Sequence, residues 1–201
     1  MIKKSFILIL FALSPIYSFG VTEEDVEELY RLSRGYSPST LSDEYGRLAR
    51  TMIYQENLYE VVEKLLKKSN DEKKIPFYGG LLVTSHEEDK LKARNLLKSL
   101  IKKGNSSYSF ETLKALLSSL AHLAKPSDIP VFLTWVENEN REVSETALSV
   151  LVELFPDHVV ANASYLERLE NAREAAIHNP DKVNMDKTFD VILGHKNDPS
   201  K

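Results

Sequence analysis

The side chains that could carry chemistry are spread thinly along this sequence. A helical zinc site needs two histidines one turn apart, as in H-E-x-x-H, and no pair of histidines has that spacing. The run His86 to Asp89 gathers an imidazole and three carboxylates, but the helix dipole alone favours acidic residues where a helix starts. We therefore expect no metal and no cofactor. The five histidines are His86, His122, His158, His178 and His195.

Motifs for phosphate binding and covalent catalysis are also missing. Gly79 and Gly80 lie inside an apolar helical pattern and lack the Lys-Ser or Lys-Thr that ends a phosphate-binding loop. Close helix packing or a kink explains these glycines better. The chain has no G-x-S-x-G sequence, and without cysteine it has no thiol nucleophile. We predict no catalytic residues, while a serine, histidine and carboxylate brought together by folding stay an open alternative.

Four cations at four-residue spacing form the clearest surface feature, which we call the basic stripe. This spacing places all four on one face of a helix. The face could bind an acidic protein, an anionic envelope polymer or lipid headgroups; the plainer alternative is a solvated face near acidic segments. The basic stripe consists of Lys90, Arg94, Lys98 and Lys102.

Tyrosines near the beginning of the chain give a second candidate surface. Tyr30, Tyr45 and Tyr59 fit the apolar faces of helices and are assigned to the core. Tyr36 and Tyr54 do not, and with nearby arginines they could stack against a peptide or a sugar. Both are therefore candidate partner-binding residues beside the basic stripe.

The elements that must position these residues are helices, and the clearest pair spans Asp128 to Phe155. Asp128 and Pro130 predict a helix start, because the first turn needs a side-chain acceptor and tolerates a missing N–H. Asn140 predicts the start of a second helix, which ends before Pro156. Two short amphipathic helices joined by a polar turn make a hairpin.

An earlier segment, Lys74 to Ile101, aligns with this hairpin. The Ile-Pro pair at Ile75 falls on the Ile-Pro pair at Ile129, and apolar residues fall on apolar residues at each core position. Leu81 falls on Trp135, which we therefore assign to the core. The earlier segment also carries a capping box, Ser85-x-x-Glu88, at its second helix.

The hairpin at Asp128 to Phe155 resembles a HEAT repeat. Its first helix begins with Ile-Pro, a polar turn follows, and its second helix contains the Val-x-x-x-Ala-Leu pattern from Val143 to Leu148. It departs from that family at Ser144, where a basic residue is common. Leu48 to Ser69 resembles a tetratricopeptide hairpin instead. Both resemblances imply stacked antiparallel helices, so we expect an all-α solenoid of about eight or nine helices.

The remaining segments complete this prediction. Thr22 and Asp25 form a capping box for the first helix, and Val159 to Ile177 reads as one long final helix. No segment alternates in the two-residue period of a strand. We expect one domain over residues 21–178 and a partly mobile tail over 179–201. The apolar patch from Phe189 to Leu193 either docks this tail on the domain or makes one weak contact.

The first twenty residues have the composition of an export signal. Lys3 and Lys4 precede the apolar run Phe6 to Leu13, which is too short to span a bilayer, and small residues end at Gly20. We expect cleavage before Val21 and export, most simply to a bacterial periplasm, or to the extracellular space. Losing the two lysines changes the net charge from −4 to −6. An acidic, exported chain is a poor candidate for binding nucleic acid.

These observations favour an exported protein-interaction or adaptor module without catalytic chemistry of its own. Its partner would be another protein of the cell envelope, and the mature chain would have no integral membrane segment. Three alternatives stay open: an inhibitor or immunity-type protein that blocks one enzyme, an enzyme with an unrecognised site, and a binder of an envelope polymer.

Overall fold

The computed structural model describes residues 20–35, 43–104, 107–182 and 185–194, and these residues form helices without any strand. The predicted all-helical class is therefore confirmed. Two short 3-10 helices, η2 (Glu72–Lys74) and η3 (Pro126–Asp128), precede α4 and α7. The α-helices are α1 (Glu23–Gly35), α2 (Asp43–Ile53), α3 (Leu58–Lys68), α4 (Ile75–Val83), α5 (Lys90–Gly104), α6 (Phe110–Ala121), α7 (Ile129–Val136), α8 (Arg141–Leu154), α9 (Pro156–Val160), α10 (Ala163–Ile177) and α11 (Asp186–Gly194).

Side-chain caps explain where several helices begin. The Asn140 side chain accepts a hydrogen bond from the Val143 N–H at 3.1 Å, as expected for the N-cap of α8. The capping box before α1 also forms, because Thr22 N–H donates to Asp25 Oδ2 and Asp25 N–H donates to Thr22 Oγ1. Local sequence thus sets these starts without help from distant residues.

Two predicted helix starts differ from the structure. Ser85 does not cap α5, which begins only at Lys90; its buried hydroxyl has no hydrogen-bond partner in the described part of the chain. The predicted helix over Val159 to Ile177 is divided into α9 and α10, because the Asn162 side chain accepts from the Ser164 and Tyr165 N–H groups and caps a new helix. Periodicity does not reveal such a break, since the apolar pattern continues across it.

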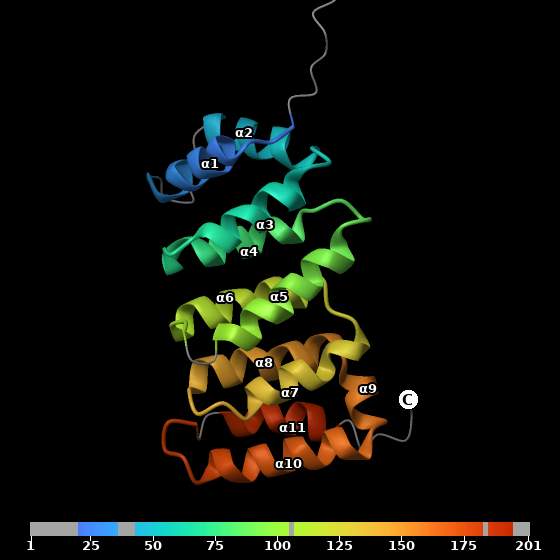
Figure 1. The fold of residues 1–201 in the computed structure, drawn as a ribbon. Coiled ribbons are helices and arrows are strands. Elements are labelled where there is room, and N and C mark those ends of the chain that lie inside the picture. The colour runs from blue at the N-terminus through green and yellow to red at the C-terminus, as the bar shows by residue number, and fades with distance from the viewer. Residues whose placement is uncertain (1–19, 36–42, 105–106, 183–184, 195–201) are drawn as a thin grey trace, which may run out of the picture.

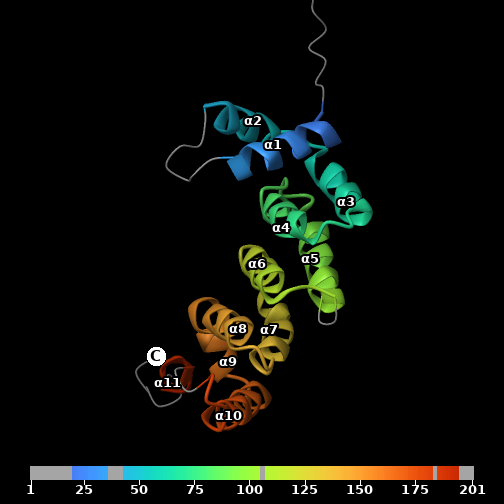
Figure 2. The ribbon, with the colours of Figure 1, turned by 90° about the vertical axis from the view of Figure 1, so that its left-hand side faces the viewer.

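The helices lie in successive layers along one axis (Figure 1). Contacts join α3 with α4, α5 with α6, α7 with α8, and α10 with α11, so each layer from α3 onward holds two helices. In the side view, α4, α6, α8 and α11 form one row and α3, α5, α7 and α10 form the other (Figure 2). In every layer from α3 onward, therefore, the helix of each row has one side that faces solvent.

The two hairpins that align in sequence do not take equivalent places in this stack. The alignment places α4 on α7 and α5 on α8, yet α4 lies in the row of α8 and α5 lies in the row of α7 (Figure 2). Amphipathic helices match one another at core positions whichever row they occupy, because each buries only one face.

The core runs through all layers between the two rows. Tyr78, Phe132 and Leu116 are fully buried, and Trp135 is 5% exposed, as its alignment with Leu81 predicts. At the C-terminal end, α11 packs against α8 and α10. Phe189 and Ile192 of α11 are fully buried, so the apolar patch docks on the domain. Among the described residues, each helix is too short or too polar to cross a lipid bilayer.

Candidate binding grooves

The basic stripe lies on α5, but its four cations have different surroundings. Arg94 and Lys98 turn toward Asp128, at the junction of η3 and α7. Lys90 pairs with Glu87 in the turn before α5, at 2.8 Å. Lys102 is exposed. The stripe is therefore partly an internal ion-pair network and partly a free surface, which its helical spacing alone does not show.

Asp128 is fully buried and is the centre of this network. Its Oδ1 accepts from the Lys98 ammonium at 3.0 Å, and its Oδ2 accepts from the Lys125 backbone N–H at 3.0 Å. Arg94 Nε lies 3.4 Å from Oδ2, close enough for an ion pair but not aligned as a hydrogen bond. Asp128 is thus the N-cap residue of α7 by position only, because its carboxylate binds cations of α5 rather than the first N–H groups of α7.

A groove between α5 and α7 lies beside this network; we call it the α5/α7 groove. Its walls are mostly apolar, and its volume is about 510 Å³. Lys98 and Lys102 lie one helical turn apart along its α5 wall. The groove can accept an apolar side chain and place a neighbouring carboxylate near an ammonium group. The apolar lining consists of Ile101, Pro130, Val131 and Trp135.

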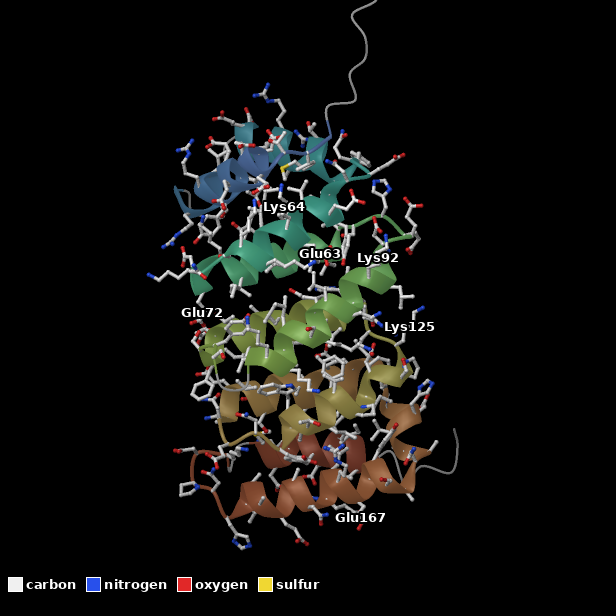
Figure 3. The ribbon with its side chains drawn as sticks, viewed as in Figure 1. Glu63, Lys64, Glu72, Lys92, Lys125 and Glu167 are labelled. Atoms are coloured by element: carbon white, nitrogen blue, oxygen red, sulfur yellow. The ribbon has the colours of Figure 1, made fainter. Side chains whose placement is uncertain are left out.

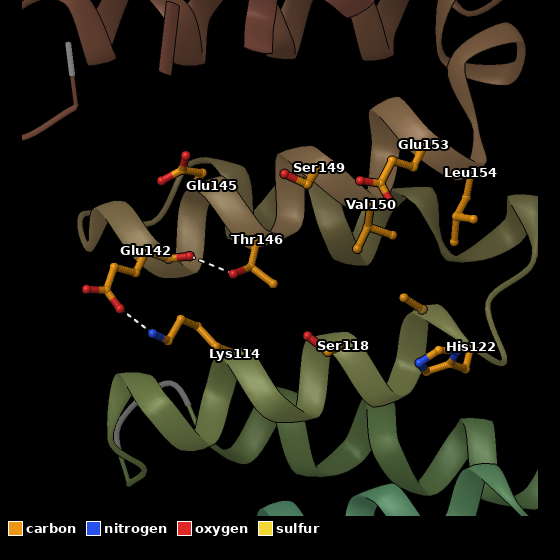
Figure 4. A pocket seen from close by; sticks show the side chains of 11 residues that line it. Lys114, Ser118, His122, Glu142, Glu145, Thr146, Ser149, Val150, Glu153 and Leu154 are labelled. Carbon is orange, nitrogen blue, oxygen red and sulfur yellow. Dashed lines mark hydrogen bonds and ion pairs between the residues drawn. The ribbon is translucent and has the colours of Figure 1, made fainter. Parts of the chain in front are cut away.

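A second hollow, the α6/α8 groove, opens between α6 and α8 and has a volume of about 840 Å³ (Figure 4). An ion pair between Lys114 and Glu142 lies at one end, and the Lys114 ammonium lowers the pKa of the Glu142 carboxyl. His122 and Leu154 face each other near the other end (Figure 4). Leu154 is 47% exposed, so this end of the groove is apolar and open to solvent.

The α6/α8 groove contains the side-chain types of a hydrolase without their arrangement. Ser118, His122 and Glu153 all line it. No hydrogen bond joins any two of these three in the described part of the chain. In a hydrolase site the base lies within hydrogen-bond distance of the nucleophile, and the orienting carboxylate lies within hydrogen-bond distance of the base. Ser118, His122 and Glu153 do not meet this requirement with one another in the described residues.

The candidate tyrosines differ in their exposure to solvent. Tyr54 is 75% exposed, beyond the end of α2, so it is available to a partner. Tyr59 is buried in the core, and a cation from α5 lies over its ring: Lys92 Nζ is 5.6 Å from the centroid. Tyr36 lies outside the described residues. In the described residues, no cluster of three or more histidine or carboxylate side chains could hold a metal ion.

Sequence reasoning missed both the role of Asp128 and the α6/α8 groove. Lys98 and Asp128 are 30 residues apart, and nothing local indicates that they meet. The groove has a weak signal in the sequence. Ser118 and His122, the C-cap residue of α6, are one helical turn apart, as are Ser149 and Glu153 on α8, and both polar faces flank apolar ones. Only the packing of α6 against α8 shows that these faces adjoin.

In the described residues, the α5/α7 groove, the α6/α8 groove and the Asp128 network contain no nucleophile hydrogen-bonded to a base. Comparison with protein-family models, with curated proteins and with solved structures gives no match to this chain.

Proposed function

We propose that this protein is an exported protein-interaction module whose α5/α7 groove binds an acidic, partly apolar segment of one partner protein. The observation that carries this proposal is the position of Lys102. It lies on the rim of a largely apolar groove, exposed and with no carboxylate in ion-pair distance among the described residues. An apolar anchor beside a cation suits a segment that alternates apolar residues with aspartate or glutamate.

The architecture we propose is an α-solenoid in which each layer is one repeat. The helices of the α5 row begin at Leu58, Lys90, Ile129 and Ala163, so successive repeats have similar lengths. Such an array exposes long grooves between layers and needs no chemistry to function as a scaffold. The resemblance of α7 and α8 to a HEAT repeat supports the same architecture.

Export of the protein rests on the composition of its first twenty residues. Cleavage before Val21 would remove only Gly20 from the described residues and leave every described helix intact, since α1 begins at Glu23. The partner would then be found in the cell envelope, in a periplasm or outside the cell. A measured N-terminus of the exported protein at Val21 would agree with this proposal.

The test compares retention of envelope proteins by the native protein, Lys102→Glu and Lys103→Glu. Lys103 is also exposed on α5 but does not line the groove, so it is the matched control. One protein should be retained by the native chain and by Lys103→Glu, and released by Lys102→Glu. The purified partner should then bind the native chain about tenfold more tightly than Lys102→Glu, because charge reversal at a rim contact removes attraction and adds repulsion.

Lys98 and Arg94 are poor positions for this test, because both balance the buried Asp128 charge and their loss would disturb the fold. Equal retention by both variants would rule out the α5/α7 groove as the binding surface.

A further inference from the structure

A cavity of about 460 Å³ lies between the start of α5 and the chain that leads from α6 to η3. We call it the Arg94 cavity. Lys90 and Arg94 line it from α5, and His122 and Lys125 line it from the other side. Lys125 lies on the same side of the stack as Lys92 and opposite Glu72 (Figure 3). The cavity is separate from the α5/α7 groove, which lies farther along α5 and shares no lining residue with it.

Positive charge exceeds negative charge at this cavity. Its lining contains three cations, of which Lys90 is paired with Glu87. Asp128, behind Arg94, divides its single negative charge between Arg94 and Lys98. The side chains of Arg94 and Lys125 therefore remain without a full counter-charge. Lys125 is exposed and has no carboxylate within ion-pair distance in the described residues.

Two donors of the Arg94 side chain also have no acceptor among the described residues. Its side chain is 11% exposed, and both Nε and Nη1 are buried without an acceptor. A buried donor without an acceptor loses its hydration and gains nothing in return, which is costly for a charged group. An acceptor from outside the protein would satisfy the guanidinium.

We propose that the Arg94 cavity binds a phosphate-type anion, held by the Arg94 guanidinium and the Lys125 ammonium, with Lys90 and His122 at its edge. A planar guanidinium suits two phosphate oxygens, whereas an ammonium adds a point charge. Asp128 also accepts from Lys98 and from the Lys125 N–H, so Arg94 is not its only donor. The ligand is either a free phosphate group or the phosphate of a lipid headgroup, and both offer the same oxygens.

The experiment titrates the purified full-length protein with inorganic phosphate by calorimetry, and measures co-sedimentation with vesicles of phosphatidylglycerol and of phosphatidylcholine. Arg94→Gln should weaken binding about tenfold or more, because it removes a charged bidentate donor. Lys125→Gln should weaken binding about threefold to tenfold, since it removes only an exposed charge. Lys103→Gln, which removes an equal charge from α5 outside the cavity, should leave the affinity unchanged.

Lys125→Gln keeps the test decisive if Arg94→Gln does not fold, because the Lys125 side chain is exposed. Binding of phosphate or of phosphatidylglycerol vesicles that Lys125→Gln weakens and Lys103→Gln does not supports the site, and the probe that binds identifies the source of the phosphate. Absence of binding to both probes, or an equal loss in both lysine variants, overturns it. Lys102→Glu should not alter phosphate binding, so failure of this proposal and failure of the α5/α7 groove are separate results.

Discussion

A single carboxylate, that of Asp128, joins two distant parts of the chain. It is fully buried and has donors from α5 and from the backbone at Lys125. Burying a carboxylate is costly unless cations and hydrogen bonds compensate for its lost hydration. Here the compensation comes from Arg94 and Lys98, so half of the basic stripe has a structural role.

Asp128→Asn should lower the free energy of unfolding by about 3 kcal/mol, because two partly buried cations would lose their counter-charge. The measurement is urea unfolding at neutral pH. Asp157→Asn, at an exposed carboxylate, is the control and should change stability by less than about 0.5 kcal/mol. A similar change in the two variants would mean that Asp128 does not stabilise the fold through its cations.

Glu27 connects α1 to α4 and makes stability dependent on pH. Its carboxylate accepts from the Lys74 ammonium and from the Tyr78 hydroxyl. Burial raises the pKa of Glu27, but these two hydrogen bonds and the Lys74 charge outweigh it, so the pKa lies below its ordinary value of 4.5. Burial and the same contact raise the pKa of the Tyr78 hydroxyl.

A carboxyl whose pKa is lower in the folded state stabilises the protein above its unfolded pKa, and this contribution is lost as pH falls through the folded value. Glu27→Gln should therefore destabilise the protein at pH 7 and differ less and less from the native chain as the pH falls below about 4.5. Urea unfolding of both proteins at several pH values between 7 and 3 measures this difference. A constant difference over the whole range would contradict the stated cause.

At the scale of the element, α4 shows how two adjacent glycines can have opposite roles. Gly79 faces α6, where a Cβ would lie 3.0 Å from Leu116 Cδ2, and Leu116 is fully buried. Gly80 is exposed, and a Cβ there would meet no atom within 4 Å. Close packing of α4 on α6 thus requires the first glycine and not the second.

Gly79→Ala should destabilise the protein by about 1–2 kcal/mol, since the new Cβ would crowd the fully buried Leu116 side chain. Gly80→Ala should stabilise it by about 0.5–1 kcal/mol, because alanine favours the helix. Thermal unfolding of the two single variants beside the native chain measures both signs. Stabilisation by Gly79→Ala would show that α4 and α6 can separate slightly at no cost.

The whole molecule is a stack in which most contacts join neighbouring helices. Central layers have neighbours on both sides, whereas α1 and α2 at one end and α10 and α11 at the other have neighbours on one side (Figure 1). In such an array stability depends on nearest-neighbour interfaces, so the end layers can open while the centre remains folded.

Native-state hydrogen exchange should therefore show the slowest exchange in α6 and α8, with the amides of α2 and α11 exchanging through local opening. Phe189 and Ile192 anchor α11, so Phe189→Ala should speed exchange in α11 far more than in α6. Equal acceleration in both helices would indicate that the stack unfolds as a single unit.

The sequence by itself determined the helical class, the starts of helices such as α1 and α8, and the burial of residues such as Trp135. These properties depend on local signals: three- and four-residue apolar spacing, Asn140 and Thr22 as caps, and proline at helix starts. Local signals did not predict the break at Asn162, because an asparagine is as compatible with a helix surface as with a cap.

Only the tertiary structure decided which helices share a row and which charged residues meet. The alignment of the two hairpins matched α4 with α7, although packing places them in different rows. The basic stripe was visible as a pattern, but its division into the Asp128 network, the Arg94 cavity and the exposed Lys102 depends on residues from the α6 to α7 connection and from α7. The spacing of residues along one helix determines which of them share a face. Which residues that face contacts depends on how helices distant in the sequence pack.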